Sequence, residues 1–286
     1  MRLRNLNLSL DLGLYDMTLI DFLFFVLTGC VVGFLAGLFG VGGGFVMVPI
    51  LIFSYEHSGV SPTVLTHLAI GTSLFVVVFA SMTSAYQHRK QKTIHWRSVF
   101  LIGFSSALTA FATARLAAEL SGRHLQIAFA IIVIAAAIRM LTESETQAEK
   151  KLELSSMPST SGLVGVGVAA GVVSALAGIG GGLFTIPLMY NFLKMPLKLS
   201  IGTSSAAIVI TAFFAVIGYI VSGIGRLGLP EWGVGFVDLQ RGVALAIGSV
   251  FLARVGAYVS FKTHPFRLKK LFALFVILIS LYILLK

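Results

Sequence analysis

Long apolar runs separated by short polar segments make up most of the chain. A helix that crosses a bilayer needs about 20 mostly apolar residues. Eight runs approach or reach that length: Phe22–Phe39, Val64–Ala85, Val99–Ala118, Ile127–Ile138, Leu163–Ala177, Ala206–Val221, Val243–Ser260 and Leu271–Leu285. Two shorter runs, Phe45–Phe53 and Leu183–Phe192, would cover roughly half a bilayer at about 1.5 Å per helical residue. The pattern predicts an all-α polytopic membrane protein with about eight long transmembrane helices and two short ones that are broken or re-entrant.

A glycine-rich motif occurs twice. Residues 33–51 read GFLAGLFGVGGGFVMVPIL, and residues 171–189 read GVVSALAGIGGGLFTIPLM. At a constant offset of 138 residues, the motif aligns Gly40, Gly42, Gly43, Gly44 and Pro49 with Gly178, Gly180, Gly181, Gly182 and Pro187. Further along, Gly71-Thr72-Ser73 matches Gly202-Thr203-Ser204 in the same order. The chain is therefore expected to contain two homologous transmembrane repeats, 1–141 and 162–286, joined by a polar linker at 142–161.

The composition supports a membrane protein. Hydrophobic residues make up 57% of the chain and charged residues 11%, whereas a soluble domain is about 45–50% apolar and about 25% charged. The net charge of +10 could suggest nucleic acid as a partner. The basic residues instead cluster between apolar runs, as in cytoplasmic loops, so we expect the lipid bilayer and no nucleic acid. The single cysteine, Cys30, lies within an apolar run and is interpreted as packing.

The number of membrane segments per half decides whether the two halves have the same or opposite orientations in the membrane. With five segments each, the second half is inverted relative to the first. One side then holds His88–Arg97, the linker, Lys194–Lys198 and Lys262–Lys270, which carry most of the Lys and Arg and would be cytoplasmic. With four segments each, the repeats are parallel and the charge bias is nearly as good. We favour inverted repeats, because short helices beside glycine-rich breaks are common in such transporters. The expected location is the cell membrane, with several passes.

The glycine clusters are the strongest candidates for a binding site. Glycine accepts positive φ and exposes backbone amides, and a broken helix persists in lipid only when buried in protein or lining a wet cavity. The helix after each break would point its N-terminus, an anion site by geometry and dipole, toward the break. Close helix packing is the alternative, and it fits the spacing of Gly29, Gly33 and Gly37. Three glycines in a row do not fit it. The predicted substrate-binding glycines are Gly40, Gly42, Gly43, Gly44, Gly178, Gly180, Gly181 and Gly182, with Pro49 and Pro187 as helix-break prolines.

The repeated hydroxyl residues are the next candidates. Thr72, Ser73, Thr203 and Ser204 could donate to an anion without carrying charge. The ordinary alternative is that they bond their own helix or a neighbouring one. The sequence holds no H-E-x-x-H, G-x-S-x-G or Walker motif. We therefore expect no catalytic residues, no metal and no cofactor, and no acidic residue lies in the middle of a span.

These residues resemble the TauE/SafE family of sulfite exporters, a group of bacterial membrane permeases. The similarity lies in G-x-x-A-G-x-x-G-x-G-G-G-x-x-x-x-P-x-L at Gly33–Leu51, in its looser copy at Gly171–Met189 and in the G-T-S steps, and covers nearly the whole chain after residue 18. The resemblance implies export or uptake of sulfite, sulfoacetate or related organosulfonates. The second copy has Ser174 and Ala175 where the first has Ala36 and Gly37, so the two half-sites are expected to be unequal.

Three functions remain open at this point. The first is a secondary transporter with a central anion site and alternating access. Proton coupling is compatible with it, because an oxyanion can itself carry a proton. The second is an anion channel on the same scaffold, which single-channel currents would reveal. The third is a membrane enzyme or assembly factor, which would give a substrate-dependent product without flux.

Overall fold

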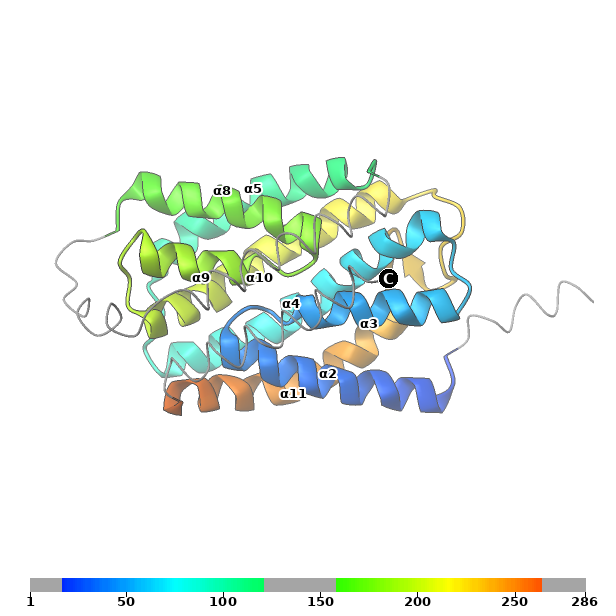
Figure 1. Cartoon of the computed structure of the whole chain (residues 1–286), viewed down its shortest axis with the longest axis horizontal. Helices are drawn as coiled ribbons and strands as arrows, with labels where there is room; N and C mark the ends of the chain where they lie inside the picture. Colours follow the sequence, from blue (N-terminus) through cyan, green and yellow to red (C-terminus); the bar gives the residue numbers. More distant parts are fainter. Residues whose placement is uncertain (1–16, 121–157, 264–286) are drawn as a thin grey trace, which may run out of the picture.

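The computed structural model describes residues 17–120 and 158–263, which are mostly helical (Figure 1). Six helices are long and apolar enough to cross a membrane. They are α2 (Leu19–Phe39), α4 (Pro62–Lys90), α5 (Trp96–Ala117), α8 (Thr160–Ala177), α10 (Leu197–Gly223) and α11 (Leu239–Lys262). Two shorter helices, α3 (Gly44–His57) and α9 (Gly182–Asn191), follow the two glycine motifs, and a small antiparallel pair, β1 (Gly233–Val234) and β2 (Val237–Asp238), precedes α11. The chain is therefore a polytopic helical membrane protein.

Six of the eight predicted long runs correspond to these helices. The runs Ile127–Ile138 and Leu271–Leu285, and the linker as far as residue 157, lie outside the described residues. Helix α8 begins at Thr160, two residues before the predicted start of the second repeat. The division into repeats at 1–141 and 162–286 otherwise stays a prediction.

Local chemistry sets the ends of the helices that precede the breaks. Thr18 caps α2 by accepting a hydrogen bond from the Asp21 amide, and the Asp21 carboxylate accepts one from the Thr18 amide. Ser159 caps α8 in the simpler way, through the Gly162 amide. Both helices end where a glycine, Gly40 or Gly178, adopts the left-handed conformation.

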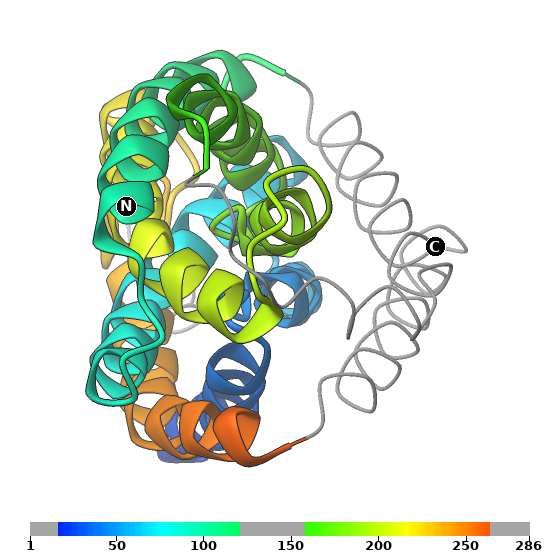
Figure 2. The ribbon, with the colours of Figure 1, turned by 90° about the vertical axis from the view of Figure 1, so that its left-hand side faces the viewer.

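Small residues allow the outer helices to pack closely. Helix α2 lies along α11, and added Cβ atoms at Gly29 and Gly33 would overlap the backbone of Leu245 and Ser249. Helix α8 lies along α5 in the same way, with Gly167 against the backbone of Ile102. The packing interpretation of the α2 glycines is thus confirmed, and these two pairs flank a central layer of α3, α4, α9 and α10 (Figures 1 and 2).

Helices α4 and α10 run antiparallel through the middle of the molecule (Figure 1). Gly71 near the start of α4 lies against Tyr219 near the end of α10, whereas Ser84 near the end of α4 bonds Ser205 near the start of α10. These helices carry the two G-T-S steps, so helices that are equivalent by sequence run in opposite directions.

Charged residues separate toward the two ends of the helices. The end that faces the viewer in Figure 2, here called the basic end, carries Arg89, Lys90, Lys92, Arg97, Lys194, Lys198 and Lys262. Two contacts connect neighbouring helices at this end. Arg97 of α5 donates a hydrogen bond to Thr160 of α8, and the Lys198 ammonium of α10 lies 4.9 Å from the centre of the Phe261 ring of α11. The opposite end, here called the acidic end, carries Asp21, Glu56, Glu119, Glu231 and Asp238 together with Arg115, Arg226 and Arg241, and the Arg226 guanidinium pairs with Glu119 at 2.8 Å.

Candidate functional site

Both glycine motifs adopt the same left-handed backbone. The φ angles are 66° at Gly40, 82° at Gly42 and 79° at Gly43. At the aligned positions of the second motif, Gly178, Gly180 and Gly181, they are 68°, 76° and 81°. A side chain is strained in this region of φ, so three glycines in each break are required by the backbone itself.

The two breaks contact each other in the centre of the molecule. A Cβ at Gly44 would overlap the Gly178 carbonyl oxygen, and one at Gly182 would lie 2.9 Å from the Gly40 carbonyl oxygen. A Cβ at Gly42 would lie 3.2 Å from the Ile179 carbonyl oxygen. All eight predicted glycines are buried. The structure therefore brings together the glycines that the sequence singled out, at a place where the start of each short helix meets the break of the other half. We call this place the crossing.

Backbone donors at the crossing lack acceptors. Within the described residues, the amides of Gly42, Gly43 and Gly44 donate to no acceptor, and neither do those of Gly180 and Gly181, whereas the Gly182 amide closes the turn at 180–181. Gly43 and Gly181 cap α3 and α9 without a side-chain bond, so each short helix directs its unsatisfied amides and positive dipole end at the crossing. A buried unsatisfied amide is costly. The crossing therefore contains backbone donors of the kind that can hold a small anion.

The two serines of the G-T-S steps bond the breaks. Ser73 Oγ donates to the Gly178 carbonyl at 2.9 Å, and Ser204 Oγ donates to the Gly40 carbonyl at 3.3 Å. Each serine thus holds the last glycine before the break in the opposite half. These predicted site residues reach the crossing, and their hydroxyl protons are used by its carbonyls.

The two threonines lie elsewhere. Thr72 Oγ1 accepts a hydrogen bond from the Asp238 amide at 2.9 Å, and Thr203 Oγ1 accepts one from the His95 amide at 3.0 Å. Asp238 and His95 are the N-cap residues of α11 and α5. The threonines therefore fix the starts of two long helices on either side of the crossing, and a substrate-binding role for them stays a prediction. Pro49 and Pro187 lie inside α3 and α9.

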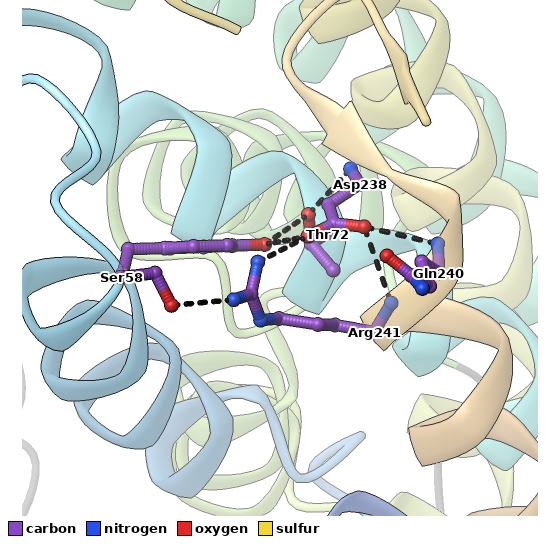
Figure 3. Close-up of polar contacts among 6 residues, drawn as sticks. Ser58, Thr72, Asp238, Gln240 and Arg241 are labelled. Atoms are coloured by element: carbon purple, nitrogen blue, oxygen red, sulfur yellow. Dashed lines mark hydrogen bonds and ion pairs between the residues drawn. The ribbon is translucent and has the colours of Figure 1, made fainter. Parts of the chain in front are cut away.

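A buried ion pair lies toward the acidic end (Figure 3). Asp238, 1% exposed, accepts from the amides of Gln240 and Arg241 through Oδ1, and from Arg241 Nη1 at 2.9 Å and the Tyr55 hydroxyl at 3.2 Å through Oδ2. Arg241 Nη2 donates to Ser58 Oγ at 2.7 Å. The ion pair between Arg226 and Glu119, by contrast, is exposed.

Sequence reasoning singles out neither residue of this ion pair, and predicts only that no acidic residue lies in the middle of a span. The available signal was the Asp-x-x-Arg spacing at the start of an apolar run, which puts both side chains at one helix terminus. Within 17–120 and 158–263, no group of three His, Cys, Asp or Glu could hold a metal ion.

Comparison with known proteins identifies the family. The family described as sulfite exporter TauE/SafE matches residues 25–283. The chain belongs to this family. Its match includes both glycine motifs, both G-T-S steps and the Asp238–Arg241 pair.

Several proteins named as probable membrane transporters are similar to this TauE/SafE protein. A probable membrane transporter protein of Haemophilus influenzae is 32% identical over 265 residues, which cover 91% of this chain and 97% of the relative. One from Methanocaldococcus jannaschii is 30% identical, covering 91% of this chain and 94% of the relative. One from Bacillus subtilis is 24% identical over 274 residues. No solved structure matches the chain. This TauE/SafE protein is thus a transmembrane transporter.

Proposed function

We propose that the protein is a secondary transporter that carries a small anion, sulfite or an organosulfonate, across the cell membrane. The observation that supports this most directly is the set of five glycine amides without acceptors at the crossing. They come from two short helices whose positive ends meet there. The family description, sulfite exporter, favours a sulfur oxyanion as the substrate.

The donor type suits reversible binding. Sulfite is compact and presents three oxygen atoms, which can accept from amides of both short helices at once. Amides carry partial charge, so they hold an anion less tightly than a lysine or arginine would. The hydroxyls of Ser73 and Ser204 keep the breaks in shape around the substrate, and Thr72 and Thr203 set the helices beside it.

Alternating access follows from the symmetry we propose. The halves form an inverted repeat of about eight long and two short helices. The antiparallel course of α4 and α10 and the reciprocal serine contacts support this arrangement. Equivalent contacts then exist toward both ends, so one half can move against the other and open the crossing to either side. By the positive-inside rule the basic end is cytoplasmic.

Flux measurements test the proposal. Proteoliposomes with the purified protein should take up labelled sulfite, and uptake should accelerate when unlabelled sulfite is loaded inside, as expected for a carrier. A proton gradient should alter the rate if protons are coupled. Gly43→Leu combined with Gly181→Leu should abolish uptake, since both positions require positive φ.

The control and the contradicting results are equally direct. Gly165→Ala lies on α8 with open space at its Cβ position and should keep wild-type uptake. A correctly folded double leucine variant with unchanged uptake would show that the crossing is not the site. Single-channel currents from the wild type would favour a channel on the same scaffold instead.

A further inference from the structure

The guanidinium of Arg241 has one edge that the protein leaves partly unused. Arg241 is 8% exposed. Its Nη1 donates to Asp238 and its Nη2 to Ser58. Its Nε is buried and has no hydrogen-bond partner among the described residues. A buried donor without an acceptor is costly in a native structure, so this nitrogen points to a ligand.

The unused edge has the geometry of an oxyanion fork. Nε and one Nη of a guanidinium present parallel N–H groups that match two oxygens of a carboxylate, sulfonate or sulfite. Here Nη2 donates to the Ser58 hydroxyl. An anion can take the place of this hydroxyl as the acceptor for Nη2, and the hydroxyl can then donate its own proton to the anion. Nη1 stays on Asp238, so binding does not require the ion pair to break.

The surroundings favour weak but oriented binding. The Arg241 Cζ lies 4.7 Å from the centre of the Tyr55 ring and 5.9 Å from that of the Phe25 ring, so the fork is held in position by aromatic side chains. Asp238 neutralises the guanidinium charge, which leaves the fork to bind by directed hydrogen bonds. A site on a transport path needs an affinity low enough for release.

Two connections link this fork to the crossing. Helix α3 begins at Gly44 in the crossing and ends at His57, next to Ser58. The length of this helix, about 20 Å, separates Ser58 from the crossing. Thr72 accepts from Asp238 while its neighbour Ser73 donates to the Gly178 carbonyl.

We propose that Arg241 and Ser58 form a second oxyanion site, which receives the substrate on the acidic side of the crossing. This inference rests on the proposed function for its place on the path.

Transport kinetics of the full chain test the fork. The probe is labelled sulfite, and KM is measured from the acidic end. Arg241→Lys keeps the charge but removes the fork, and should raise KM about tenfold or more, as expected when a charge-assisted pair of hydrogen bonds is lost. Asp238→Asn keeps the N-cap but removes the neutralising charge, so it should lower KM. A purely structural ion pair would not lower KM when it is broken.

Controls separate binding from folding. Arg226→Gln removes an exposed arginine of the acidic end and should leave KM unchanged. If Arg241→Lys fails to fold, the double variant Asp238→Asn with Arg241→Gln keeps a neutral hydrogen-bonded pair and should show the same rise in KM. Either Arg241 variant, folded and with wild-type KM, overturns the proposal.

Calorimetry separates this inference from the proposed function. If wild-type vesicles move no sulfite, sulfite binding to the purified wild type and Arg241→Lys is compared directly. Binding that weakens about tenfold or more in the variant supports the fork even without transport. Equal binding, or no binding to the wild type, overturns it.

Discussion

Gly44→Ala tests whether the crossing depends on direct backbone contact. The residue is helical, so an alanine there has no φ penalty. Its methyl group would lie 2.9 Å from the Gly178 carbonyl carbon and the Ile179 Cα, and closer still to the Gly178 oxygen. Carbon atoms in contact prefer about 3.5–4.0 Å, and the oxygen lies closer than either carbon, so the breaks must separate by more than about 1 Å. Overpacking of this kind costs about 1–3 kcal/mol.

Two measurements on purified Gly44→Ala check this reasoning. Thermal unfolding should show a decrease of a few degrees in Tm, and sulfite uptake should fall toward background because the amides of the two short helices no longer meet. Gly165→Ala is the matched control, since it adds the same methyl to a helix with open space and should gain about 0.4–1 kcal/mol through the unfolded state. Wild-type Tm and uptake in Gly44→Ala would refute the close crossing.

Two further predictions concern the serines and the orientation. Ser73→Ala leaves the buried Gly178 carbonyl unpaired and should destabilise the protein by about 1–3 kcal/mol. Ser204→Ala should cost less because its bond is longer, 3.3 Å against 2.9 Å, and thermal unfolding showing the reverse order would contradict this. In a Cys30→Ser background, an impermeant maleimide should label Glu231→Cys on intact cells and Lys90→Cys only after permeabilisation. Labelling of both from one side would exclude the proposed topology.

Hydropathy predicted the positions of the helices better than their lengths. The predicted run Ala206–Val221 lies inside α10, which begins at Leu197. The missing first turns contain Ser200 and Thr203–Ser205, whose hydroxyls interrupt an apolar pattern although the backbone is helical. Helix α4 likewise continues beyond Ala85 through polar residues to Lys90. Apolar runs therefore mark the middle of a membrane helix, not its capped ends.

The glycine clusters could be predicted because their chemistry is local. Three glycines within four residues that need positive φ leave a direct trace in the sequence. The partners of Thr72 and Ser73 leave none, since they lie 166 and 105 residues away in the other half. Two adjacent hydroxyls therefore looked equivalent, although one bonds a helix start and the other a break. Arg241 was missed for a related reason, because its value as a binding group depends on which of its nitrogens the fold leaves unused.

The contact between Ser204 and Gly40 has a consequence for biosynthesis. The two residues are 164 positions apart, which a ribosome covers in roughly 10 to 30 seconds at about 5–20 residues per second. During that interval the nascent first half has a finished break whose carbonyl still lacks its donor. Release of that half into lipid would leave the polar backbone without a partner, so it must be sheltered at the insertion machinery until the second half arrives.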